Sequence, residues 1–264
     1  MKLVIRAAAA AVWLAAVLVA PGPATAQDIK PVFSVKTRSI EASLKIDPRL
    51  KAYPKLYAGL LAEGKREVEK WRRSADEDRK ATPDDFAGGQ RYAFERKYTQ
   101  SSAIGRYIGV DVDDYLNNGA AHPNIETDTI LWNTALEKRI SIRPFFKESA
   151  TNGPTLNKIA KAIRAALAEK KKQRGGDHVD PETNTELANV QPDLLKMGAV
   201  SVVRSTDPGR SAGLNFHFSA EAVGIYAEGS YNAFVPWQTF KDDLSPDGAA
   251  LFGGARPKAD EDKD

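Results

Sequence analysis

The chain has 264 residues, of which 42% are hydrophobic and 28% are charged. This composition excludes wholesale disorder and allows either one large domain or two small ones. The chain contains no cysteine, which excludes disulfides, thiol catalysis and thiolate metal sites.

The first 26 residues have the parts of an export signal. A basic start is followed by the apolar run 7–20, which is too short to span a bilayer of about 30 Å comfortably. Prolines then end the run, and small residues follow up to Ala26, as a signal peptidase requires. We therefore predict a signal peptide over residues 1–26, cleaved after Ala26, and a periplasmic protein. An uncleaved membrane anchor is the alternative.

Cleavage leaves a nearly neutral chain. Removal of Lys2 and Arg6 leaves 36 of the 38 basic residues against 35 acidic ones, a net charge of +1. This balance argues against a nucleic-acid partner. No later run is long and apolar enough for a membrane span, and the residue on which a bacterial lipoprotein is acylated, cysteine, is missing. We expect a soluble protein that binds no nucleic acid.

Apolar patterns predict the elements of the N-terminal part, residues 27–145. Residues 31–46 alternate apolar and polar side chains, which indicates one or two strands. Residues 47–80 carry an apolar stripe at spacings of three, four and seven, which predicts one long helix. Three further strands, rich in aromatic and β-branched residues, are predicted over residues 91–100, 106–115 and 127–136.

The C-terminal part, residues 146–250, begins with the clearest helical pattern in the chain. This helix covers residues 155–174, with Pro154 in its first turn and cations followed by glycines at its end. We predict a disordered tail over residues 251–264, which are rich in Pro, Gly and charge. Three short strands precede it, over residues 200–204, 214–218 and 232–237.

Together these elements predict the fold class. Strands, a helix, strands, a second helix and strands follow one another along the chain, which is typical of an α+β fold. We expect a single α+β envelope domain over residues 27–250, with a largely antiparallel sheet packed with two long helices.

The run from 215 to 237 combines aromatics, glycines, a histidine and two acids. On a strand, the phenylalanines at alternate positions point one way, while Asn215 and His217 point the other. We interpret His217 as a residue on the polar face of a half-buried sheet. Residues 226–229 predict a turn, and Pro236 limits the next strand to an edge or a bulge.

A second notable segment is 117–124, NNGAAHPN. Gly119 marks a tight turn, because Asn and Gly tolerate positive φ, and His122 follows just before a proline. A rigid loop that holds an imidazole suits a ligand contact, and it equally suits a chain reversal between strands. The role of His122 is therefore open between structural hydrogen bonding and binding.

The common catalytic and metal motifs do not occur in the sequence. The three histidines are not at ligand spacing, and HExxH, GxSxG, phosphate-loop and GxGxxG motifs are missing. Asp111, Asp113 and Asp114 resemble part of a calcium loop but lack its glycine and glutamate, so we interpret them as acids at the end of a strand. We predict no catalytic residue, no metal and no cofactor.

Two segments together resemble a known family, the envelope domain of the anti-sigma factor RsiV and the peptidoglycan deacetylase PdaC. The first is NGAAHPN followed by TDTILWN and SIRPFF, where the family has a GGAH turn before a strand. The second is the Phe-rich strand followed by IYAEG, where the family has PYAxG, and then a strand ending in Pro and an aromatic. Ala120 and Ile225 depart from the glycine and proline of the family.

The resemblance covers roughly residues 53–244 and implies an extracytoplasmic α+β domain. In RsiV this domain binds lysozyme, and in PdaC it accompanies a separate catalytic domain. The implied function is a non-catalytic binding module that contacts a lysozyme-like muramidase or peptidoglycan. We expect two loops to carry the contact, through Gly119, His122, Tyr226 and Glu228, since Tyr is a common interface anchor.

Two other functions remain open. One is an envelope hydrolase with His122 as general base, because an imidazole titrates near neutral pH. The other is a structural protein without a specific ligand.

Overall fold

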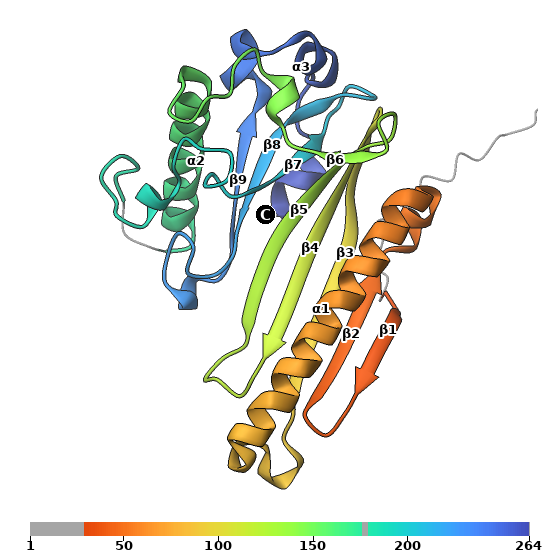
Figure 1. Ribbon diagram of the computed structural model, residues 1–264. Coiled ribbons are helices and arrows are strands. Elements are labelled where there is room, and N and C mark those ends of the chain that lie inside the picture. Colours follow the sequence, from red (N-terminus) through yellow and green to blue (C-terminus); the bar gives the residue numbers. More distant parts are fainter. Residues whose placement is uncertain (1–28, 176–178, 264) are drawn as a thin grey trace, which may run out of the picture.

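The computed structural model describes residues 29–175 and 179–263. The predicted signal peptide, residues 1–26, lies outside these ranges. Within them, no helix combines the length and the apolar character needed to cross a bilayer. Figure 1 shows two sheets, each covered on one face by a long helix.

The N-terminal part folds into a six-stranded sheet in the order β1-β2-β3-β4-β5-β6 (Figure 1). All neighbouring strands are antiparallel except β2 and β3. These two are parallel because the long helix α1 crosses over between them. The strands are β1 (Pro31–Lys36), β2 (Ile40–Ile46), β3 (Tyr92–Ile104), β4 (Tyr107–Asn117), β5 (Asn124–Asn133) and β6 (Lys138–Ile140).

Helix α1 (Pro54–Ala81) packs on β2 and β3. The predicted helix began at residue 47, but Pro48–Ala52 form a separate 3₁₀ turn that Asp47 caps by accepting the N–H of Arg49 at 2.9 Å. The α-helix then begins at a second proline, which suits a first turn because it has no N–H to satisfy.

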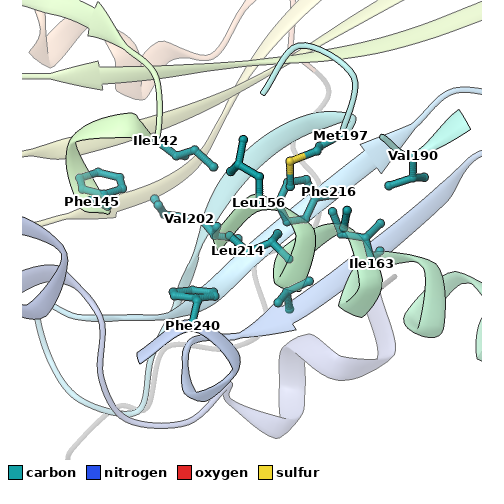
Figure 2. Close-up of a cluster of buried hydrophobic side chains, with 14 of the residues drawn as sticks. Ile142, Phe145, Leu156, Ile163, Val190, Met197, Val202, Leu214, Phe216 and Phe240 are labelled. Carbon is teal, nitrogen blue, oxygen red and sulfur yellow. The ribbon is translucent and has the colours of Figure 1, made fainter. Parts of the chain in front are cut away.

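The C-terminal part packs α2 (Pro154–Gln173) on a three-stranded antiparallel sheet in the order β7-β8-β9. The strands are β7 (Ala199–Arg204), β8 (Ser211–Phe218) and β9 (Tyr231–Pro236). Helix α2, alternate strand residues and the short helix α3 (Pro246–Leu251) form an apolar core, part of which is drawn in Figure 2. The predicted α+β class, largely antiparallel and with two long helices, is confirmed.

The face of the three-stranded sheet turned away from α2 lies against the six-stranded sheet, mainly through contacts of β7 with β3, β4 and β5. Thr129 Oγ1 in β5 donates to the carbonyl of Val200 in β7 at 2.8 Å. The N–H of Thr127 donates to Ser219 Oγ, just beyond β8, at 3.0 Å. The sequence pattern predicted a half-buried sheet, with solvent on this face of β8. In the structure the six-stranded sheet lies over this face.

Residues 252–260 pack against the rest of the structure, whereas the sequence predicted a disordered tail over residues 251–264. Phe252 is only 2% exposed and packs edge-on against Phe145 and Phe240. Trp237 Nε1 donates to the carbonyl of Gly254 at 2.9 Å, and Asp260 forms an ion pair with Arg204 at 2.7 Å. Composition missed these contacts because every partner lies outside the tail itself.

Two glycines of α1 give a matched pair that tests the packing of α1. Gly59 is exposed, and a Cβ there would meet nothing within 4 Å, whereas a Cβ at Gly64 would overlap the fully buried Leu44 of β2. We predict that Gly59→Ala raises the midpoint of thermal unfolding, since alanine stabilises a helix interior by about 0.5–1 kcal/mol relative to glycine. We predict that Gly64→Ala lowers the midpoint, because overpacking a core costs about 1–3 kcal/mol. Circular dichroism measures both thermal midpoints. If the two variants shift the midpoint in the same direction, the close approach of α1 to β2 is contradicted.

Candidate functional site

The structure brings His122 and Tyr226 into direct contact. Their rings are stacked, with centroids 3.5 Å apart and planes 18° apart. The Tyr226 hydroxyl donates to the carbonyl of Pro123 at 2.5 Å. His122 lies in the loop between β4 and β5, and Tyr226 opens the 3₁₀ turn Tyr226–Glu228 that precedes β9. The two loops singled out in the sequence therefore lie side by side.

Gly119 sets the shape of the first loop. Its φ is +83°, in the left-handed region that favours glycine. Its N–H donates to the side-chain oxygen of Asn117 at 3.1 Å, and the N–H of Ala120 donates to that of Asn118 at 3.4 Å. A Cβ at residue 119 would meet nothing within 4 Å. The glycine is therefore required by backbone conformation and not by space.

Glu228 fixes the second loop to α2. Its Oε2 accepts hydrogen bonds from Lys171 Nζ at 2.5 Å and from the Tyr231 hydroxyl at 2.7 Å. Lys171 is only 5% exposed and pairs also with Glu186 at 2.9 Å. Arg174, directly after α2, donates to the carbonyl of Glu228 at 2.9 Å. The hydrogen bond from Lys171 is the main reason that the pKa of Glu228 is lowered. Glu228 thus anchors the loop from within the structure.

Three exposed apolar side chains lie on the segments that lead into or out of the two loops. Ile225 is 60% exposed, Ile125 is 45% exposed and Tyr115 is 38% exposed. Tyr115 and Ile125 face each other across the β4–β5 ladder, and Ile225 directly precedes Tyr226. We term Tyr115, His122, Ile125, Ile225 and Tyr226 the apolar patch.

A hollow of about 680 Å³ lies along β5, and its lining includes Asn124, the residue before Ile125 of the apolar patch. Its acids Glu126 and Asp128 face the α1 side of the sheet, whereas Ile125 faces the other side. Three exposed acids line it, Glu126, Asp128 and Glu221, and none of them forms an ion pair with a described residue. The two arginines of the hollow are each paired with one of its acids, as Arg96–Asp114 and Arg139–Glu63. This acidic hollow therefore presents net negative charge to solvent.

The surroundings of His122 do not supply the partners of a general base. The residue is exposed, its ring neighbour is Tyr226, and no hydrogen bond joins it to a carboxylate of the described chain. General-base catalysis needs an acceptor held in reach of a bound substrate and oriented by a second group. Nor do three His, Asp or Glu side chains gather anywhere in the described ranges to hold a metal ion.

A second polar region lies between the two sheets, and we term it the inter-sheet groove. Its volume is about 740 Å³, and its lining includes Asp111 from β4, Ser201 from β7 and His217 from β8. Ser201 Oγ lies 2.8 Å from His217 Nε2. The expected polar face of β8 thus faces a groove and not open solvent. The sequence pattern placed Asp111 at the end of a strand. In the structure it lies in the middle of β4, which continues to Asn117.

Several side-chain oxygens of the inter-sheet groove have no hydrogen-bond partner among the described residues. They are Gln100 Oε1, Ser102 Oγ, Asp111 Oδ1 and Asn215 Oδ1. Burial raises the pKa of the Asp111 carboxyl, although His217 and a hydrogen bond from Ser101 act in the opposite direction. Unpaired buried oxygens of this kind are uncommon in folded proteins.

Sequence reasoning missed the inter-sheet groove, although one signal was available. Residues 110–113 alternate valine with aspartate, and an acid in the middle of a strand is rarely buried without a partner. The serines at 101, 102 and 201 carried no such signal, since serine is equally common in loops and on exposed strands.

Two solved structures of DUF3298-family proteins resemble this one. A protein from Bacteroides fragilis is 12% identical, with a TM-score of 0.50 over 83% of this chain and 94% of its own. A protein from Pseudomonas aeruginosa is 13% identical, with a TM-score of 0.49 over 81% of this chain and 87% of its own. At this identity the first likeness shows a common fold and nothing further. No protein-family profile and no curated protein matches the sequence.

The Lys171–Glu228 pair predicts a pH dependence of stability. Folding lowers the pKa of Glu228 below its ordinary 4.5, so the pair stabilises the fold above that pH, and the contribution is lost as the pH falls through the lowered value. We expect Glu228→Gln to cost about 1–2 kcal/mol near neutral pH, seen as a lower thermal midpoint. The difference from the wild type should shrink as the pH falls below 4.5 and through the lowered pKa of Glu228.

Glu77→Gln, on the exposed face of α1, is the control for this pH series. Glu77 has no ion pair with a described residue, so the variant should follow the wild type at every pH. A loss in Glu228→Gln that stays constant with pH would contradict an electrostatic anchor.

Proposed function

We propose that this protein is a non-catalytic binding module of the bacterial cell envelope, exported to the periplasm, whose apolar patch contacts a protein partner. The observation that carries the proposal is the stacked His122–Tyr226 pair, which joins two distant segments into one exposed apolar surface. Exposed apolar patches with a polar rim commonly mark interaction sites, and aromatic side chains are common anchors in them.

The apolar patch is held in place before any partner arrives. The Tyr226 hydroxyl is hydrogen-bonded to the carbonyl of Pro123, and Lys171 holds Glu228 two residues further on. A surface that is already ordered loses less conformational entropy when it binds. This favours recognition by a preformed surface over a loop that folds on contact.

The charge beside the apolar patch selects between the two partners that the sequence suggested. Glu126, Asp128 and Glu221 give the neighbouring hollow a negative field. Such a field attracts a protein with a basic surface and repels an anionic wall polymer. We therefore favour a basic, lysozyme-like muramidase over peptidoglycan as the partner of the apolar patch.

The resemblance noted in the sequence supports the same proposal. Both loops of the apolar patch lie in the segments that resemble the envelope domain of RsiV and PdaC, and in RsiV that domain binds lysozyme. The fold shared with the DUF3298-family protein from Bacteroides fragilis is compatible with this relationship.

Binding to a purified basic lysozyme tests the proposal, with two exposed aliphatic residues as a matched pair. Ile225 belongs to the apolar patch, whereas Leu195, 94% exposed, lies on the turn before β7. We expect Ile225→Asp to weaken binding at least about tenfold by calorimetry, because it places an unpaired charge in the interface. Leu195→Asp should bind like the wild type.

Isolated peptidoglycan sacculi form the second arm of that experiment. Retention on sacculi that Ile225→Asp abolishes would assign the apolar patch to the wall polymer instead. No binding of lysozyme or sacculi at tens of micromolar would overturn the proposed partners. Hydrolysis of wall material that depends on His122 would overturn the non-catalytic reading.

The acidic hollow predicts a salt dependence for the same complex. We expect the association rate to fall as ionic strength rises, since screening removes the attraction between exposed charges. The double variant Glu126→Gln, Asp128→Asn should show a slower association and a weaker salt dependence, with the dissociation rate nearly unchanged. Stopped-flow measurement at several salt concentrations checks this, and an unchanged salt dependence would contradict the role of the hollow.

A further inference from the structure

The inter-sheet groove takes no part in the proposed protein contact, yet it has the features of a built site. Ser102 and Asn215 are 5% and 6% exposed, and both line the groove. Neither Ser102 Oγ nor Asn215 Oδ1 has a hydrogen-bond partner among the described residues. Leaving a buried oxygen unpaired destabilises a fold, so such atoms are usually paired in the functional state.

The floor of the inter-sheet groove is shaped by a bulge in β3. The β3–β4 register shifts between Gln100 and Ser102, so consecutive polar residues reach the same side of the sheet. Opposite them, Gly109 has no side chain, and a Cβ there would overlap Ser102 Oγ and crowd Ser101 Oγ. The bulge and the glycine together concentrate hydroxyl and amide groups at one place and keep space above them.

The charges around the inter-sheet groove are largely paired with one another. Arg204 forms an ion pair with Asp260 at 2.7 Å, and Arg49 forms one with Asp47 at 2.5 Å. Asp113 forms an ion pair with Lys97 at 3.6 Å, and the remaining acid of the lining, Asp111, has no ion pair among the described residues. An anionic ligand would meet an unpaired carboxyl at this point, so the groove favours a neutral ligand.

The chemistry of the lining narrows the ligand class. The oxygens of Asp111 and Asn215 need hydrogen-bond donors, whereas Ser102 can both donate and accept. Sugar hydroxyls offer donors and acceptors at close spacing, and a groove of about 740 Å³ is within the usual size of a small-molecule site. We propose that the inter-sheet groove binds a neutral saccharide, whose hydroxyl groups donate to the side-chain oxygens of Asp111 and Asn215.

Titration calorimetry with two neutral probes tests this proposal, the tetramer of N-acetylglucosamine and maltotetraose. We expect at least one of them to bind, and we expect Asn215→Leu and Asp111→Asn each to weaken that binding about tenfold. Gln173→Leu, an exposed position at the end of α2, should bind like the wild type.

Thermal unfolding of the same variants separates a ligand-binding role from a structural one. Since these oxygens lack partners in the described chain, Asn215→Leu and Asp111→Asn should keep or raise the thermal midpoint near neutral pH. Lower midpoints with unchanged saccharide binding would show that the oxygens serve the fold, for example through bridging water, and would overturn the proposal.

Two further outcomes decide the matter and keep this proposal distinct from the proposed function. If neither saccharide binds at about 10 mM, the saccharide proposal is overturned. It is also overturned if the groove binds the cationic probe spermidine and neither saccharide. Ile225→Asp should bind the saccharide normally while losing the protein partner, because Ile225 does not line the groove. Either proposal can therefore fail while the other stands.

Discussion

The arrangement of this protein depends on the contact between its two sheets, much of which is polar. Each sheet buries its apolar face under its own helix, α1 on β2 and β3, and α2 on β9. At one end of the contact, the six-stranded sheet adds Ile104, Tyr107 and Leu131 to the apolar core of the C-terminal part. Elsewhere polar faces meet, and there the contact relies on individual hydrogen bonds such as Thr129 to Val200 and Thr127 to Ser219. Polar faces cannot close as tightly as an apolar core, because every buried oxygen and nitrogen needs a partner. The inter-sheet groove is the space that follows from this constraint.

The same contact between sheets places the two loops of the apolar patch together. The β4–β5 loop carries His122, and the segment after β8 carries Tyr226. The stacking of these two rings therefore requires the two sheets to keep their relative position. The ion pair between Lys171 and Glu228 adds a second constraint from α2. The surface is thus fixed from both halves of the chain, which explains how residues without any local relationship form one rigid patch.

Sequence patterns predicted the parts of this fold that local periodicity determines. The apolar stripes gave α2 nearly to the residue, whereas the start of α1 was placed too early because Pro54, not Asp47, opens the helix. The side-chain alternation in β8 correctly set His217 on the polar face, but no local pattern states what covers that face. The prediction of a disordered tail was wrong for the same reason, since Phe252 packs against Phe145 and Phe240 from distant segments.

The two candidate surfaces share one structural element, and this links them physically. Asp111 lines the inter-sheet groove, while Tyr115, four residues further along β4, belongs to the apolar patch on the same face of the strand. A ligand between the sheets and a partner on the patch would both depend on how the sheets are held against each other. If each stabilises one spacing of the sheets, the two binding events must influence one another by the same factor in either direction. The contact between the sheets would then be the element through which the proposed small ligand and the proposed protein partner affect one another's binding.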